Sequence, residues 1–241
     1  MSQTEKASTA NLLLAALGHD DRALIERHSQ HVRLEREQVL VETNKPVEYV
    51  YFLESGIGSI TAASENGRTE VGIFGWDGFS GTALLLGSDR SPHETFIQIG
   101  NADALRLNAD HFMGAVEQSS TLRRTMLRYM QTLLIQTAQS AVANARYQIE
   151  ARLARWLLMC HDRVNGDEIA LTHEFMAMMI GAQRSGVTVA LHILEGTGMI
   201  RSKRGRVVIL DREKLEDLAG DSYGPAEAEY RRLIGPLGRP A

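Results

Sequence analysis

Residues 171–206 read LTHEFMAMMIGAQRSGVTVALHILEGTGMIRSKRGR, and this stretch decides the fold. Thr172 is placed to cap a short helix over residues 174–180, because a threonine hydroxyl can accept a hydrogen bond from a first-turn backbone NH. Gly181 then supplies the left-handed backbone conformation that ends this helix. A second helix is predicted over residues 184–195, so two short helices meet at a glycine turn.

The predicted second helix has an apolar face and an opposite, more polar face. Helical spacing buries Val187, Ala190 or Leu191, and Leu194. The opposite face carries Arg184, Ser185, Thr188, Val189 and His192. Helix, glycine turn and helix is the order of a helix-turn-helix, whose second helix enters the major groove of DNA. We expect this outer face, together with Thr172 and Gln183, to contact DNA, with Arg184 and Ser185 nearest to the base edges.

A basic hairpin is predicted directly after the second helix. Residues 199–201 and 206–210 are expected to form two short strands, with Arg201, Lys203, Arg204 and Arg206 at and around the connecting tip. Such a wing suits contact with the DNA backbone or the minor groove. The pattern is also compatible with an ordinary α+β unit, but a glycine turn, a polar outer face and an Arg-rich wing follow one another within about forty residues, which favours DNA binding.

Upstream of this stretch, apolar residues recur at every second position. Val32, Leu34, Val39 and Val41 begin the pattern, and short strands are predicted over residues 49–54, 57–61, 70–74, 95–99 and 104–107. Asn66-Gly67 is a strong signal for a hairpin turn, since both central positions of such a turn favour positive φ. The sequence therefore predicts an antiparallel, jelly-roll-like β-roll. Two short helices, over residues 10–17 and 20–27, are expected before it, with Asp20 capping the second.

Between the roll and the helix-turn-helix lies a long predicted helix. Residues 120–144 contain no Gly or Pro, and an apolar stripe recurs at spacings of three and four. The stripe comprises Leu122, Met126, Tyr129, Leu133, Thr137, Ala141 and Asn144, and the first five are the expected dimerisation residues. It could be a core helix of one chain, or it could pair with a second copy in a parallel coiled coil. Because the helix is long and bridges two units, we expect dimerisation through this stripe. A further helix is predicted over residues 146–162.

Composition narrows the class of protein. The chain has 241 residues, 44% of them hydrophobic and 23% charged, which is typical of a globular protein large enough for two folded units. Cys160 is the single cysteine, so no internal disulfide can form, and we expect a cytoplasmic location. The apolar runs are too short to span a bilayer, so no membrane partner is expected. The net charge of −4 hides a local basic stripe over residues 184–212.

Along nearly its whole length the chain resembles the Crp/Fnr family of bacterial transcription regulators. In the roll, the resemblance rests on residues 51–56, YFLESG, followed by Gly58, Ser59 and Ile60; in the C-terminal part it rests on residues 171–195. It implies an α+β protein with an N-terminal β-roll sensor, a long dimerisation helix and a C-terminal winged helix-turn-helix. It also implies a homodimer on a palindromic site in double-stranded DNA, with RNA polymerase as a further partner. The expected boundaries are 1–117 for the roll, 118–145 for the dimerisation helix, 146–220 for the DNA-binding unit and 221–241 for a tail.

The positions that hold cyclic AMP in some members of this family differ here. The resemblance aligns a ribose-binding Glu with Thr82, and a phosphate-binding Arg with His93, which Glu94 follows. A buried phosphate would lack a permanent counter-charge, so cyclic AMP is not expected to bind. The effector is expected to be a neutral or weakly polar small molecule, if there is one. The candidate pocket residues are Trp76, Gly81, Thr82, Arg90 and His93; Trp76 could instead belong to a packed turn.

Other function classes have weaker support in the sequence. A β-roll metalloenzyme of the cupin type needs two or three histidines and a carboxylate, whereas the roll offers only His31 at its entry and His93 in a loop. A regulatory module without DNA binding would leave the basic wing unexplained. No nucleophile, base and orienting group occur together, so we expect neither catalysis nor a metal or other cofactor. Cys160 is expected to be a core residue rather than a sensor thiol.

Overall fold

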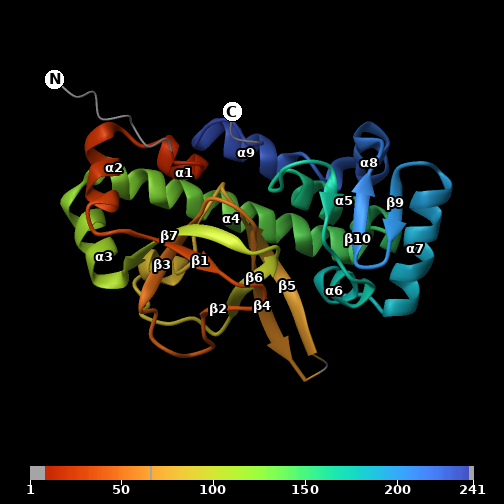
Figure 1. Cartoon of the computed structure of the whole chain (residues 1–241), viewed down its shortest axis with the longest axis horizontal. Helices are drawn as coiled ribbons and strands as arrows, with labels where there is room; N and C mark the ends of the chain where they lie inside the picture. The colour runs from red at the N-terminus through yellow and green to blue at the C-terminus, as the bar shows by residue number, and fades with distance from the viewer. Residues whose placement is uncertain (1–8, 66, 239–241) are drawn as a thin grey trace.

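The computed structural model describes residues 9–65 and 67–238. The chain begins with two short helices, α1 (Leu12–Ala15) and α2 (His19–Glu26), which lie at one end of the molecule (Figure 1). Asn11 caps α1 by accepting a hydrogen bond from the Leu14 NH. The expectation that Asp20 caps the second helix is wrong: α2 begins one residue earlier, Gly18 takes the cap position, and Asp20 lies in the first turn.

Two antiparallel sheets form the β-roll that the alternating pattern predicts. One sheet has the order β1-β7-β3 and the other β2-β6-β4-β5. The strands are β1 (Gln30–Leu34), β2 (Val39–Val41), β3 (Tyr49–Leu53), β4 (Ile57–Ser64), β5 (Gly67–Phe74), β6 (Glu94–Ile99) and β7 (Ala102–Asn108). A short 3-10 helix, η1 (Thr82–Leu86), lies between β5 and β6, and α3 (Ala109–Gln118) follows β7. Strands β4 and β5 pair as a hairpin up to Ser64 and Gly67, while Asn66 of the predicted turn lies outside the described residues.

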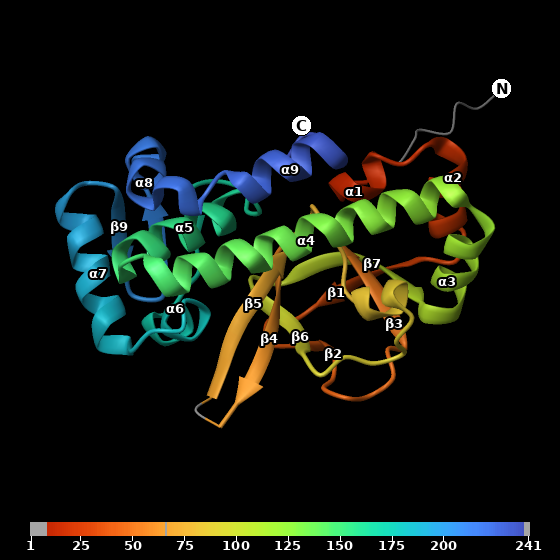
Figure 2. The same cartoon turned by 180° about the vertical axis from the view of Figure 1, so that it is seen from behind.

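Helix α4 (Ser120–Arg146) runs along the roll and on to the C-terminal unit (Figure 2). The first part of its predicted stripe is inside the chain: Leu122 and Met126 are fully buried, and Tyr129 lies 5.1 Å from Phe79 between ring centroids. Thr137 is half-buried and donates a hydrogen bond to the Val71 carbonyl of β5, 3.0 Å away. Leu122, Met126, Tyr129 and Leu133 are thus buried within the single chain, where they are not available for the predicted dimer seam. The roll has an apolar face that needs covering, and α4 uses the stripe for that purpose.

The C-terminal unit contains a small sheet surrounded by helices. Its elements are α5 (Ile149–His161), β8 (Glu168–Ile169), α6 (His173–Met179), α7 (Arg184–Gly196), β9 (Ile200–Lys203), β10 (Arg206–Ile209) and α8 (Arg212–Ala219). The sheet has the order β8-β10-β9, and all its pairs are antiparallel. This is the helix-turn-helix with a β-wing that residues 171–206 predict.

The segment predicted to be a C-terminal tail contains a packed helix. A short 3-10 turn, η2 (Gly220–Ser222), leads to α9 (Pro225–Leu233), which lies beside α4 in both views (Figures 1 and 2). The Tyr230 hydroxyl donates to the Asp77 carbonyl of the roll over 2.9 Å, and the Glu227 carboxylate accepts from the Gly224 NH over 2.9 Å. The C-terminal segment thus connects α8 back to the roll.

The roll and the C-terminal unit share one apolar core. Ile57, Ile73 and Phe96 of the roll belong to the same buried cluster as residues of α5, α6 and α7. Phe96 meets Phe175 of α6 edge-on, with 6.4 Å between ring centroids. A buried ion pair crosses the same boundary, because Arg163 at the end of α5 donates to both carboxylate oxygens of Asp77, at 2.6 and 3.0 Å.

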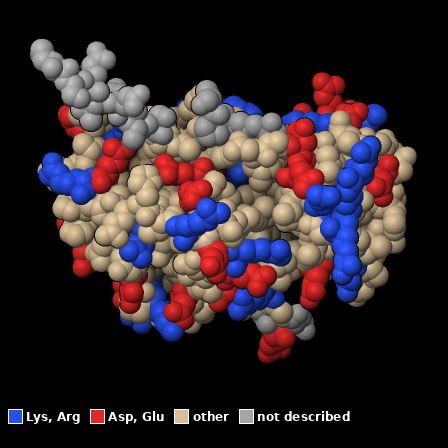
Figure 3. Space-filling view, in the orientation of Figure 1, with Lys and Arg blue, Asp and Glu red and all other residues tan. Residues whose placement is uncertain are grey.

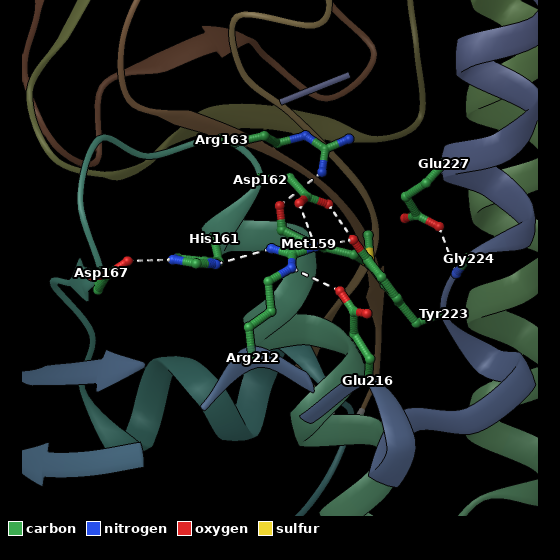
Figure 4. A network of polar contacts seen from close by, with 10 residues as sticks. All are labelled: Met159, His161, Asp162, Arg163, Asp167, Arg212, Glu216, Tyr223, Gly224 and Glu227. Carbon is green, nitrogen blue, oxygen red and sulfur yellow. Dashed lines mark hydrogen bonds and ion pairs between the residues drawn. The ribbon is translucent and has the colours of Figure 1, made fainter. Parts of the chain in front are cut away.

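A polar network fixes the end of α5 against α8 (Figure 4). The Arg212 guanidinium donates to Asp162, to Glu216 and to Nδ1 of His161 at 2.7 to 2.9 Å. Since that nitrogen accepts, Nε2 of His161 carries the hydrogen and donates to Asp167, 2.9 Å away. The Tyr223 hydroxyl donates to the second oxygen of Asp162 over 2.7 Å. Helix α5 is therefore held between the roll on one side and α8 on the other.

Candidate nucleic-acid interface and roll cavity

The helix-turn-helix has the local geometry that its sequence predicts. The Thr172 hydroxyl accepts a hydrogen bond from the Phe175 NH over 3.2 Å, which caps α6. Gly181 adopts φ +57°, and α7 begins at Arg184. A guanidinium nitrogen of Arg152 on α5 donates to the Ile180 carbonyl, and so links α5 to the turn between α6 and α7.

Helix α7 divides into a buried and an exposed face as expected. Val187, Ala190, Leu191 and Leu194 are buried. Arg184, Ser185, Val189 and His192 are exposed, and so is Gln183 at the cap. Thr188 is half-buried, and its hydroxyl donates to the Arg184 carbonyl over 3.0 Å, which leaves its methyl group for any outside contact. Ile193, which sequence reasoning missed, is 45% exposed beside Val189 at 56%; the i, i+4 spacing from Val189 would have identified it.

The wing places its cations on the surface beside α7. Arg201, Lys203, Arg204 and Arg206 are exposed, and Figure 3 shows a continuous basic band over β9 and β10. Arg206 forms an ion pair with Glu168 at 3.1 Å, so part of its charge is compensated within the chain. Glu195 near the end of α7 accepts a hydrogen bond from the Ser202 NH over 2.9 Å, which fixes the wing relative to the helix. Sequence reasoning missed this positioning contact.

A groove separates α7 from the wing. Its lining includes Thr172, Arg184, His192, Lys203 and Arg204 of the predicted set. His173 and Glu174 at the start of α6 also line it, although the sequence gave no reason to choose them. Five of the eleven predicted DNA-contact residues therefore surround one surface depression, and the other six lie outside its lining.

A separate cavity of about 350 Å³ lies between the roll and α4. Gly81, Thr82 and His93, three of the five candidate effector-pocket residues, line it. The other two residues predicted for the pocket, Trp76 and Arg90, do not line the cavity. Trp76 is only 1% exposed and sits in a packed turn, and Arg90 is at the surface, where it forms two hydrogen bonds of 2.9 Å with Asp89. Local sequence could not distinguish a pocket from a packed turn at Trp76.

A buried carboxyl group, Glu70 of β5, lies where the roll meets α5. Ser59 donates to one of its oxygens over 2.9 Å and the Trp156 indole NH to the other over 2.8 Å. Burial raises the pKa of Glu70 to about 8, although both hydrogen bonds act in the opposite direction. Val71, the next residue, lines the roll cavity. Sequence reasoning missed Glu70 because nothing local distinguishes it from an exposed strand residue.

The groups considered for metal or thiol chemistry are dispersed. Within residues 9–65 and 67–238, no three or more His, Cys, Asp or Glu side chains are grouped so that they could hold a metal ion. His31 faces Glu54 at 3.4 Å, whereas His93 lines the cavity. Cys160 is fully buried, and burial raises the pKa of its thiol well above the ordinary value. No helix in the described part of the chain is both long enough and apolar enough to cross a bilayer.

Comparison with known families assigns both units. The model of the cyclic nucleotide-binding domain matches residues 31–119, and that of the Crp-like helix-turn-helix domain matches residues 151–218. The chain belongs to the Crp/Fnr family. It is accordingly a DNA-binding regulator of the Crp/Fnr type with a cyclic-nucleotide-binding-like roll. A search of curated protein sequences found no significant match.

Several solved structures share the fold. A regulator of the Crp/Fnr family from Eubacterium rectale has a TM-score of 0.67 and 18% identity, and the match covers 88% of this chain and 99% of that one. FixK2 from Bradyrhizobium japonicum has a TM-score of 0.68 and 16% identity, and the match covers 80% of this chain and 98% of that one. The c-di-GMP-responsive regulator CLP from Xanthomonas campestris has a TM-score of 0.64 and 17% identity, with coverage of 80% of this chain and 99% of that one. At these identities the likeness establishes the fold.

Proposed function

We propose that this protein is a sequence-specific transcription regulator that binds a palindromic DNA site as a homodimer. The observation that carries the proposal is the exposed outer face of α7 beside the basic wing. Arg184 and Ser185 lie in the first turn of α7, where side chains reach the base edges of a major groove, and the wing cations lie where a phosphate backbone would pass. Contact with RNA polymerase, which the family resemblance implies, is part of the same proposal.

The homodimer seam is assigned to a face of α4 that shares only Ala141 with the stripe predicted from the sequence. Helix α4 has a second row of residues at alternating spacings of three and four, all exposed: Arg124, Leu127, Gln131, Leu134, Ala138, Ala141 and Ala145. This is the spacing of a coiled-coil seam. The side chains in the C-terminal half of the row are alanines, which are small enough to let two helices approach closely. Leu134 is 57% exposed, and burying it against a second copy would remove a large apolar side chain from water. Helix α4 would then cover the roll with one face and contact its partner with the other.

The DNA contact is tested with DNA fragments that the wild-type protein selects from random sequence. Arg184→Ala should weaken binding to the selected site by about 5- to 150-fold and relax the preference at one position in each half-site, because a bidentate Arg–guanine contact contributes about 1–3 kcal/mol. Lys45→Ala, on an exposed loop of the roll, is the matched control and should bind normally. Equal loss on selected and random DNA would show that Arg184 contacts only phosphate.

The wing cations should contribute to DNA binding whatever the base sequence, because they are expected to contact the phosphate backbone. The double variant Arg204→Ala with Lys203→Ala should weaken binding to selected and random DNA alike. It should also reduce the slope of log affinity against log salt by about one unit for each lost phosphate contact. An unchanged slope would remove the wing from the interface.

The dimer is tested by sedimentation. Leu134→Glu with Ala141→Glu places like charges opposite each other along the seam and should give monomers that remain folded, since both positions are exposed in the single chain. Val39→Glu on strand β2 introduces the same charge at another exposed apolar residue and should leave the dimer intact. A dimer that survives both seam changes would place the interface elsewhere.

A further inference from the structure

The roll cavity has the enclosure and size of a small-molecule site. Val41, Val47, Ile60 and Val71 line its roll side, and Met130 and Leu133 close it from α4. Its volume of about 350 Å³ lies within the usual range of ligand pockets, roughly 300–1,000 Å³. Leu86, a large apolar side chain that also lines the cavity, is 64% exposed. A ligand in the cavity would remove part of this side chain from water.

The lining carries no permanent charge. No Lys, Arg, Asp or Glu is among the described residues that line the cavity. Arg90 is at the surface, paired with Asp89, and Glu94 is paired with Arg68. An anionic ligand would therefore lose its hydration without gaining a cationic partner, which is unfavourable by several kcal/mol. This excludes ligands that need a charge pair in the cavity, including those with a phosphate group.

The polar atoms of the lining are mostly engaged already. Ser80 accepts a hydrogen bond from the Tyr51 NH, Ser91 accepts one from the His93 NH, and Thr137 donates to Val71. In the described chain, the hydroxyls of Thr82 and Thr95 and the His93 imidazole have no such partner. They therefore remain available to one polar group of a ligand, and the rest of the surface offers apolar contact.

We propose that the roll cavity binds an uncharged small molecule with an apolar body and a single hydroxyl, aromatic amine or carbonyl group, which Thr82 and His93 hold by hydrogen bonds. This inference rests on the proposed function, since such a ligand would be the effector of the regulator. The ligand would touch Val71, whose neighbour Glu70 receives the Trp156 hydrogen bond from α5. Occupation of the cavity thus acts on the strand that contacts the DNA-binding unit.

The binding test uses the full-length protein without DNA. N-Phenyl-1-naphthylamine, an uncharged fluorescent molecule with one NH, should bind saturably at one site per chain. 1-Octanol should displace it, whereas octanoate, which differs by a negative charge at pH 7.5, should not. Displacement by octanoate as readily as by octanol, or the absence of saturable binding, would overturn the proposal.

Variants locate the site. Ala83→Trp introduces a bulky side chain at the cavity lining and should abolish probe binding, whereas Ala63→Trp, on the exposed part of strand β4, should leave it unchanged. Thr82→Val with His93→Leu should weaken octanol about 2- to 12-fold for each hydrogen bond lost. Normal probe binding by Ala83→Trp would refute the assignment.

A final comparison separates this inference from the proposed function. Arg184→Ala should bind the probe as wild type does while losing its DNA site. Failure of wild-type DNA binding with intact probe binding would refute the proposed function alone. Failure of probe binding with intact DNA binding would refute the ligand proposal alone.

Discussion

Replacing Glu70 by Gln should stabilise the protein at neutral pH and remove the contribution of this carboxyl group to the pH dependence of the free energy of unfolding. Burial raises the pKa of Glu70 from 4.5 to about 8 in the folded protein, so folding takes up a proton between these two values. The stability that the neutral form provides is complete below pH 4.5 and is lost as the pH rises towards 8, at about 1.4 kcal/mol per pH unit. From pH 5 to pH 7 the loss is about 3 kcal/mol.

The Gln side chain isolates this effect because it preserves the contacts. Its carbonyl can accept from the Trp156 indole, and its NH₂ can donate to the Ser59 hydroxyl. Urea unfolding at pH 5, 6, 7 and 8 and one fixed protein concentration should show the stability advantage of Glu70→Gln growing by about 3 kcal/mol between pH 5 and 7. Glu117→Gln, at an exposed position, should run parallel to wild type. A constant difference between wild type and Glu70→Gln across this range would refute the reasoning.

Two further stability predictions concern the boundary between the roll and the C-terminal part. Asp77→Ala leaves the buried Arg163 guanidinium without its carboxylate and should cost about 3–5 kcal/mol in urea unfolding; a cost below about 1 kcal/mol would mean that water reaches the pair. Tyr230→Phe removes only the hydrogen bond to the Asp77 carbonyl and should cost about 1 kcal/mol, while an unchanged midpoint would indicate that α9 does not stay docked in solution.

Local signals predicted the elements whose structure local chemistry decides. The Thr172 cap and the positive φ of Gly181 define a helix and its end within a few residues, so the helix-turn-helix could be predicted from residues 171–206. The inner and outer faces of α7 followed from helical spacing, as the burial of Val187 and the exposure of Val189 confirm.

Features that depend on packing between distant segments were not accessible in this way. Helical spacing located the apolar stripe of α4, but whether the roll or a second copy covers Met126 depends on tertiary contacts. Trp76 and Arg90 were placed in a pocket by position in the chain, whereas one is packed and the other satisfied by Asp89. The acceptor that anchors Tyr230 lies far away in sequence, so α9 was taken for a tail.

The core shared by the roll and the DNA-binding unit has a consequence for how the protein can be divided. The match to the helix-turn-helix domain begins at residue 151, yet two residues after that point contact the roll. The Trp156 indole donates a hydrogen bond to Glu70, and the Phe175 ring packs against Phe96. A fragment cut at this boundary would expose that apolar surface and should aggregate rather than fold alone. The start of the family match is thus not a boundary of autonomous folding. A chimera that joins this DNA-binding unit to another sensor domain would also need the roll surface around Phe96, against which the unit packs.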